Sequence, residues 1–321
     1  MKKTIFRLIF LLNLFVPFNI FCQEEQTSKI QVGCNFGVSS IPFAALKYVC
    51  EDKDYFSCNV NFYKTQKELI SDFINNKNQI VFLPYDVALS VMENFSNLVV
   101  CGGITQKSNV YLISSNEVKS FSDLLGKTVS IPKDDKIAQN MFKWICSQYD
   151  IQINKGLRGI ILNDLDEMVD LVPKLANFSV RYGILSEPYA SIATKKDRKN
   201  KIALDMQNEY DSVIGTFSVF PETVMLVQKS FSTTKEFLEF EELLHSVFDY
   251  ILINPEKTAK WNAKYNLIGT DYIVRLSFFK LNFCFLNNFS IYEDFLLSAK
   301  IVMPDSEFVQ KLNENNFCLF K

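Results

Sequence analysis

Four proline residues share one position in the sequence pattern, just past an apolar strand-like run and at the start of a helical run. They are Pro42, Pro84, Pro132 and Pro188. Proline is tolerated in the first turn of a helix, where its missing N–H would have no partner in any case. Short apolar runs such as the one at 80–83 are typical of buried parallel strands. The four junctions therefore predict an α/β chain with loops at the carboxyl ends of its strands.

The junctions form two pairs, which suggests two similar halves. A chain of 321 residues is near the practical limit of a single hydrophobic core. In open α/β sheets ligands bind beyond the carboxyl ends of the strands, where helix N-termini present unpaired N–H groups. We therefore expect two α/β lobes, each supplying two loops to a cleft between them.

The rest of the chain reads as a return strand followed by helices. The strand is expected at 221–227, long helices at 235–252 and 255–265, and a Phe-rich helical segment from Asp271 to about Lys300. Earlier in the chain, a helix is expected to open at 164–167 and to end or kink at Pro173.

Several segments, taken in order, resemble the periplasmic substrate-binding proteins of ABC importers. They are 110–115 with 120–129, the Glu187-Pro188-Tyr189 turn, 221–231, 254–259 and 303–308. The closest branch is the SsuA-like family of nitrate, sulfonate and pyrimidine-precursor binders. The resemblance implies a type II periplasmic-binding-protein fold, with two interlobe crossings and a mostly parallel, helix-flanked sheet in each lobe. Lobe one would comprise 30–114 and 223–321, and lobe two 115–222.

The resemblance also implies a function without catalysis. Such a protein is a monomeric receptor that closes on a small molecule by hinge motion and docks on an ABC permease. It needs no cofactor. Two alternatives remain: a surface lipoprotein without a transport role, or an enzyme of the menaquinone- or pyrimidine-pathway type on the same fold.

Candidate ligand-binding residues lie in the junction loops. Ser39 and Ser40 offer hydroxyl and backbone donors, with plain helix capping as the alternative. Tyr85 follows a buried strand and offers a ring for stacking on a planar ligand, with surface packing as the alternative.

The second half supplies four more candidates. Lys133 and Asp134 lie at a helix start, where a solvated cap is the alternative, and Glu187 and Tyr189 match the turn of the resembling family. Carboxylates near the cleft, including Asp86, favour a neutral or cationic heteroaromatic ligand such as a pyrimidine precursor. A small anion is the alternative, since it requires donors and no free carboxylate.

The first residues read as a targeting segment. Lys2, Lys3 and Arg7 precede an apolar run that ends at Phe21, and polar sequence follows. This pattern is typical of a secretory signal, assigned to 1–22, with a retained anchor as the alternative. Cys22 lies where bacterial lipoproteins receive their lipid, and simple cleavage nearby is the alternative. We therefore expect the chain either in the periplasm or attached to a membrane through a lipid on Cys22.

Charge and residue counts exclude several functions. Lys and Arg number 34 against 36 Asp and Glu, which argues against a nucleic-acid binder. His245 is the only histidine, and none of the eight cysteines forms a C-x-x-C pair, so metal sites are not expected.

Cys50 and Cys58 are candidates for a disulfide bridge, with free buried thiols as the alternative. The basic run at 195–201 reads as a solvated turn.

Overall fold

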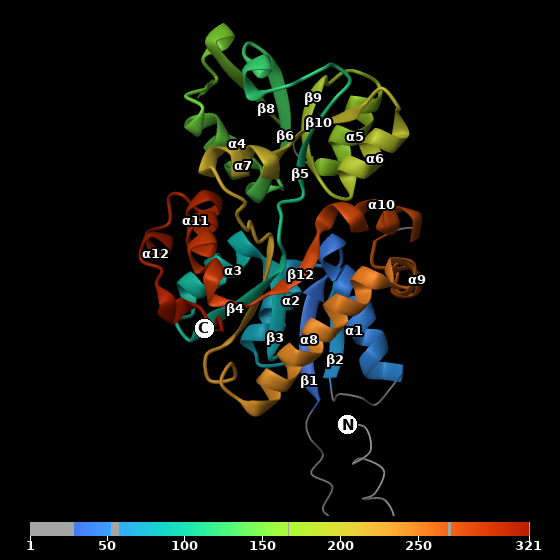
Figure 1. Cartoon of the computed structure of the whole chain (residues 1–321), viewed down its shortest axis with the longest axis vertical. Coiled ribbons are helices and arrows are strands. Elements are labelled where there is room, and N and C mark those ends of the chain that lie inside the picture. The colour runs from blue at the N-terminus through green and yellow to red at the C-terminus, as the bar shows by residue number, and fades with distance from the viewer. Residues whose placement is uncertain (1–28, 53–57, 166, 269–270, 321) are drawn as a thin grey trace, which may run out of the picture.

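The computed structural model describes residues 29–52, 58–165, 167–268 and 271–320, and over these ranges the chain forms two six-stranded sheets flanked by helices (Figure 1). The sheets belong to two lobes stacked along the long axis of the molecule (Figure 1). The expected signal at 1–22, with Cys22, lies outside the described residues. In the described part of the chain, no helix is both long and apolar enough to cross a membrane.

Lobe one is built on the sheet of order β12-β4-β11-β3-β1-β2. Its strands are β1 (Ile30–Asn35), β2 (Cys58–Tyr63), β3 (Ile80–Pro84), β4 (Leu98–Thr105), β11 (Thr223–Gln228) and β12 (Phe283–Leu286). Its helices are α1 (Ile41–Asp52), α2 (Gln66–Ile74), α3 (Tyr85–Asn94), α8 (Lys235–Ile253), α9 (Pro255–Tyr265), α10 (Asp271–Leu281), α11 (Tyr292–Val302) and α12 (Glu307–Gln310). Short 3-10 turns occur at η1 (Val38–Ser40), η4 (Phe289–Ile291) and η5 (Glu314–Asn316).

Lobe two is built on the sheet of order β10-β5-β9-β6-β8-β7. Its strands are β5 (Val110–Ser114), β6 (Thr128–Pro132), β7 (Gln152–Ile153), β8 (Gly159–Leu165), β9 (Tyr182–Ser186) and β10 (Lys201–Asp205). Its helices are α4 (Lys136–Gln148), α5 (Met168–Ala176), α6 (Tyr189–Lys196) and α7 (Met206–Ile214), with 3-10 turns η2 (Phe121–Leu124) and η3 (Gly156–Arg158). Helices α4 and α7 cover one face of the sheet, and α5 and α6 the other (Figure 1).

The two-lobed α/β prediction is confirmed, but the boundary between the lobes needs correction. β5 pairs with β9 and β10, so the first crossing runs from Thr105 to Val110, and the boundary expected after Ser114 falls at the end of a lobe-two strand. Most strands of each sheet run in one direction, as expected, and the exceptions are β5 in lobe two and β11 and β12 in lobe one, which pair antiparallel with their neighbours. The reason lies in the crossings: β5 and β11 each arrive from the other lobe and begin at the edge where the parallel strands end, so they run antiparallel to those neighbours.

All four proline junctions are confirmed as passages from strand to helix: β1 to α1, β3 to α3, β6 to α4 and β9 to α6. Two helix predictions need corrected bounds. The helix expected to open at 164–167 is present as α5, but it begins only at Met168, because 159–165 form strand β8, and it continues past Pro173 to Ala176. The segment from Asp271 to Lys300 is interrupted by strand β12.

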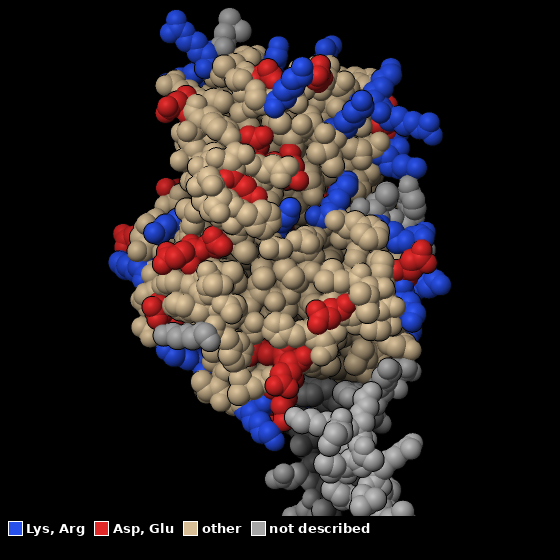
Figure 2. Space-filling view, viewed as in Figure 1, with Lys and Arg blue, Asp and Glu red and all other residues tan. Residues whose placement is uncertain are grey.

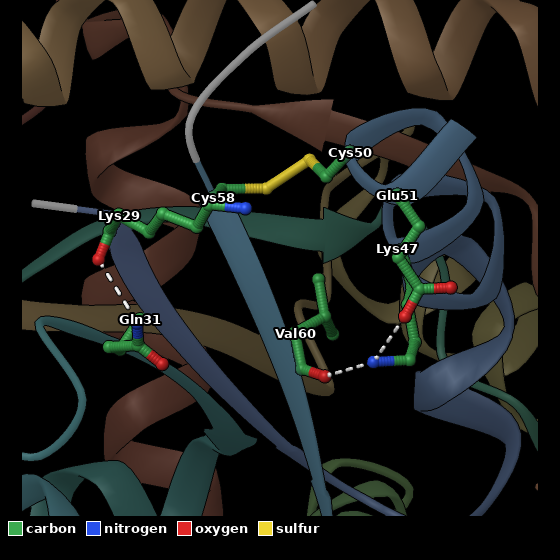
Figure 3. The surroundings of a disulfide bond; sticks show 7 residues. All are labelled: Lys29, Gln31, Lys47, Cys50, Glu51, Cys58 and Val60. Atoms are coloured by element: carbon green, nitrogen blue, oxygen red, sulfur yellow. Dashed lines mark hydrogen bonds and ion pairs between the residues drawn. A yellow bond between two sulfur atoms is a disulfide. The ribbon is translucent and has the colours of Figure 1, made fainter. Parts of the chain in front are cut away.

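The core of lobe one lies on both faces of its sheet because side chains alternate along each strand. On β11, Val224 and Leu226 pack into one cluster, and Met225 and Val227 pack into the other. A disulfide bond between Cys50 and Cys58 joins the end of α1 to the start of β2 (Figure 3). Nearby, the Lys47 ammonium contacts Glu51 at 2.9 Å and donates to the Val60 carbonyl at 3.0 Å.

The basic run at 195–201 is exposed, as the sequence predicts. Lys195, Lys196, Arg198, Lys199 and Lys201 all lie on the surface, from the end of α6 to the start of β10. Figure 2 shows basic side chains gathered along the outer edge of lobe two on this side.

Candidate functional site

A cavity of about 390 Å³ lies between the lobes, where strand ends of both sheets meet. β3 and β4 from lobe one and β6 and β9 from lobe two point their carboxyl ends at it. β5, β11 and β12 run in the opposite sense and begin at it. The lining residues at these strand ends are Pro84, Thr105, Asn109, Asp134, Asp135, Ser186, Thr223 and Phe283.

The lobe-two wall is acidic, because Asp134 and Asp135 follow β6 at the start of α4. Asp135 is the N-cap of α4, and its Oδ1 accepts a hydrogen bond from the Ala138 N–H at 2.9 Å. The Ser186 hydroxyl donates to the other oxygen. Burial raises the pKa of Asp135, and these two bonds partly offset that rise. The wall therefore presents a carboxyl group that is already held in place by its own lobe.

The lobe-one wall carries Asp86 in the first turn of α3. Burial raises the pKa of this carboxyl, the N–H of Val87 partly offsets the rise, and the facing charge of Asp135 adds to it. Lobe one and lobe two therefore both present carboxyl groups to the same cavity.

The two interlobe crossings are hydrogen-bonded to each other beside the cavity. The Asn109 N–H donates to Glu222 Oε1 at 2.7 Å, and the Glu222 N–H donates to Thr105 Oγ1 at 3.2 Å. Burial raises the pKa of Glu222 to about 8. Asn109 is only 6% exposed, and its side-chain oxygen Oδ1 has no hydrogen-bond partner. The crossings thus bring a buried acid and an unsatisfied acceptor to the cavity.

Glu187 joins the lobes at one side of the cavity. Its carboxylate lies 3.0 Å from the Lys280 ammonium of α10 and accepts from the hydroxyls of Ser191 at 3.0 Å and Ser277 at 3.1 Å. The side chain of Glu187 is buried. This charge is therefore compensated, and its first role is to hold α10 against lobe two.

Three of the seven predicted binding residues line the cavity: Ser39, Asp134 and Glu187. Ser39 comes from η1, which precedes α1, so the junction loops expected from the proline pattern do meet here. Whether these side chains contact a ligand stays a prediction.

The other four predicted residues do not line the cavity. Ser40 is buried, and its hydroxyl donates to the Gly37 carbonyl at 2.6 Å. The Tyr85 ring is in the core, where its hydroxyl donates to the Phe295 carbonyl at 2.9 Å, so it cannot stack on a ligand in this structure. Lys133 is exposed and precedes the lining residue Asp134, and Tyr189, the first residue of α6, is half-buried and packs against the lobe-two core.

Asp135 and Glu222 are cavity residues that were absent from the predicted set. Asp135 had a readable signal, since an Asp one residue before a helical run is a preferred N-cap. For Glu222 the sequence offered one weak signal, its position in Pro221-Glu222-Thr223 at the start of the return strand. Its importance depends on Asn109, which lies 113 residues away in sequence.

The residues that line the site are suited to binding a small molecule. Across the ranges that the structure describes, no group of three or more His, Cys, Asp or Glu side chains could hold a metal ion. Carboxylates, amides and hydroxyls surround a space that also has apolar walls. This combination, a few polar groups on an apolar frame, is typical of small-molecule sites.

No protein-family model and no curated protein matches the sequence. Solved structures do match. An ABC transporter from Parabacteroides distasonis superposes with a TM-score of 0.74 at 14% identity, over 92% of this chain and 100% of that one. The fold is that of a two-lobed periplasmic binding protein. The aliphatic sulphonate binding protein SsuA from Escherichia coli matches with a TM-score of 0.65 at 12% identity, over 86% and 85% of the two chains.

A third match is the zinc-bound ligand-binding component of an ABC-type import system from Staphylococcus aureus. It has a TM-score of 0.61 at 11% identity and covers 91% of this chain and 97% of that one. The periplasmic-binding-protein fold predicted from the segment order is thereby confirmed, although at these identities the match establishes the fold alone.

Proposed function

We propose that this chain is an exported solute-binding receptor of an ABC importer. It captures a small molecule in the interlobe cavity and delivers it to a permease. One observation carries the proposal: the cavity takes its walls from both lobes and from both crossings. Hinge closure around such a site buries the ligand, and a ligand that prefers the closed state shifts the population toward it.

The receptor releases its ligand chemically unchanged. His245 lies on α8, where its Nε2 is 3.1 Å from Asn287 Oδ1, and not at the interlobe cavity. Of the thiols and imidazoles in the described residues, none lines that cavity. The groups present there hold and orient a ligand, and the partners are a small molecule and a permease rather than a nucleic acid.

Export and anchoring rest on the sequence at 1–22. We assign it as a signal that delivers the chain to the periplasm, with a lipid on Cys22. Labelling of expressing cells with radioactive palmitate tests this assignment. Wild-type protein should incorporate label and Cys22→Ser should not, whereas equal labelling of both would overturn the anchor while leaving the receptor untouched.

The receptor function is tested by ligand capture. Native mass spectrometry of freshly purified protein should show a noncovalent adduct, and the ligand-free protein should gain thermal stability when the extracted molecule is returned. A large side chain at Ser39 should abolish this gain because it fills the cavity, so Ser39→Trp is the test and Ser246→Trp, at an exposed position of α8, is the control. Absence of an adduct, and of any melting shift across a metabolite panel, would overturn the proposal.

A further inference from the structure

We propose that the ligand of the interlobe cavity is an organic cation whose protonated amine, amidine or guanidine nitrogens are bound by Asp86, Asp135, Glu222 and the Asn109 amide oxygen. This inference rests on the receptor function proposed above and adds the chemical class of its ligand.

The first argument is the charge of the lining. Among the described residues that line the cavity, five carry carboxyl groups and one, Lys136, carries an ammonium. Lys280, from α10, compensates Glu187 at 3.0 Å. The remaining acids exceed the positive charge and come from both lobes and from the return crossing. They are Asp86, Asp134, Asp135 and Glu222.

The second argument is independent of charge and concerns Asn109. Its Oδ1 is a buried acceptor without a partner, in a side chain that is 6% exposed and lines the cavity. Buried polar groups nearly always have a hydrogen-bond partner, and leaving one unsatisfied is costly. The backbone N–H of Asn109 is already bonded to Glu222, so the amide oxygen is the group that awaits a donor. A ligand with N–H groups supplies that donor, and a sulfonate or carboxylate does not.

The third argument disfavours an anion at three of the helix starts around the cavity. Helix N-termini bind anions through unpaired N–H groups, yet at α3, α4 and α6 carboxylates of the protein lie at those positions. Asp135 accepts from the Ala138 N–H at the start of α4, and Glu187 accepts from the Ser191 N–H in α6 at 3.3 Å. Asp86 occupies the first turn of α3. At these three starts an anionic ligand would meet carboxylates instead of free donors, whereas the η1–α1 start, which brings Ser39 to the cavity, has no acidic residue in its first turn.

The arrangement also distinguishes an organic cation from a metal ion. The acids come from separate strand ends, and no described group of three or more is close enough to hold a metal. Apolar side chains line the same cavity and suit a carbon skeleton that carries separated nitrogens. They are Val38, Val87, Ile137, Met168, Leu281 and Phe283.

The test uses three probes of nearly equal shape and different charge: benzamidine, benzamide and benzoate. Protein freed of carried ligand by unfolding and refolding is titrated with each by calorimetry. We expect benzamidine to bind at least about tenfold more tightly than benzamide, benzoate not to bind, and added salt to weaken benzamidine binding. Glu222→Gln and Asp135→Asn should each weaken benzamidine binding about tenfold, while Asp249→Asn, at an exposed position of α8, should leave the affinity unchanged.

The outcomes separate the two proposals. Benzoate binding in place of benzamidine, or a carried ligand whose identified structure is anionic or neutral, would overturn the cation class and leave the receptor standing. A carried cation whose affinity falls in Glu222→Gln, but not in Asp249→Asn, supports both. Failure of all three probes together with the absence of any carried molecule would overturn the receptor and the cation class alike.

Discussion

The carboxyl group of Glu222 shows how a single residue of this cavity is set by its surroundings. It lies on the return crossing, 9% exposed, with one oxygen bonded to the N–H of Asn109 on the other crossing. Burial raises its pKa from 4.5 to about 8, and Asp135 adds a like charge. We therefore expect Glu222 to hold a proton at neutral pH in ligand-free protein, and a cationic ligand to displace it.

The pH dependence of stability follows from this raised pKa. Between pH 4.5 and about 8 the folded chain keeps a proton that the unfolded chain has lost. The free energy of unfolding should therefore fall as pH rises through this window, by up to about 1.4 kcal/mol per pH unit. Urea unfolding from pH 5 to pH 8 should show the fall in wild type and a smaller one in Glu222→Gln.

A matched control exists in Glu241 of α8, whose pKa burial also raises to about 8. Glu241→Gln should likewise flatten the stability profile. Only Glu222→Gln should also remove the increase in benzamidine affinity as pH rises, because Glu241 does not line the interlobe cavity. An affinity profile that is the same in Glu222→Gln and in wild type would contradict the assignment.

Two partly exposed thiols give a second prediction at the residue scale. A hydrogen bond from Cys101 lowers the pKa of Cys318 to about 6, whereas burial raises that of Cys284 to about 12. Thiolates are the reactive form. Iodoacetamide at pH 7 should therefore alkylate Cys318 well before Cys284, as measured by peptide mass spectrometry over time. Cys101→Ala should slow the reaction of Cys318, and a faster reaction at Cys284 would contradict the prediction.

At the scale of elements, the disulfide bond joins the end of α1 to the start of β2, at the edge of the lobe-one sheet (Figure 3). Its cysteines are 8 residues apart in sequence, and closing so short a loop should contribute about 2–3 kcal/mol to stability. Cys50→Ser/Cys58→Ser should melt a few degrees lower than wild type. The bond is at the start of β2, the end of the strand that lies away from the cavity. Affinity for benzamidine should therefore not change.

Reduction gives the control for the disulfide. Dithiothreitol should lower the melting temperature of wild type to that of the double variant and should leave the double variant where it is. A stability loss in the double variant with no response of wild type to reductant would show that packing of the two side chains, and not the bond, is responsible.

Elements marked by proline could be predicted from the sequence, and elements set by distant partners could not. Proline limits its own backbone and that of its neighbours, so β3-Pro84-α3 is a local signal. β8 contains Asn163 and Asp164 and ends just before α5, so its sequence resembles a helix start; parallel pairing with β6 decides otherwise. β12 follows Asn282, whose φ of 44° ends α10, and it exists because β4 offers it an edge.

The same distinction holds for the cavity. Ser39, Asp134 and Glu187 could be predicted because ligands in open α/β sheets bind at the carboxyl ends of strands. The role of Glu222 could not, since it depends on a contact with Asn109 across the two crossings. Tyr85 has the expected position in sequence, but its ring turns into the core against Phe295.

At the scale of the whole molecule, contacts on two sides hold the lobes together. On one side Lys280 and Ser277 of α10 bind Glu187. On the other side Asn140 of α4 donates to the Val302 carbonyl at the end of α11 at 2.8 Å. The lobes can open only by breaking such contacts, so the closed population should depend on them as well as on ligand.

Lys280→Met should therefore both destabilise the protein and favour opening. Removing one partner of a buried ion pair leaves an uncompensated charge and costs about 3–5 kcal/mol; Lys280 is itself 30% exposed, so the lower end applies here. Unfolding by urea should show this loss, and small-angle scattering of ligand-free protein should show a larger radius of gyration. Lys235→Met, which breaks an exposed pair with Glu239, should change neither measurement appreciably.

The double variant Lys280→Met/Glu187→Gln separates the two effects of that substitution. Replacing Glu187 by glutamine removes the uncompensated charge, so stability should recover in large part. The attraction between α10 and lobe two stays absent, so the radius should remain large and benzamidine affinity low. Recovery of stability together with a return to the wild-type radius would show that the ion pair stabilises a lobe and does not hold the two lobes closed.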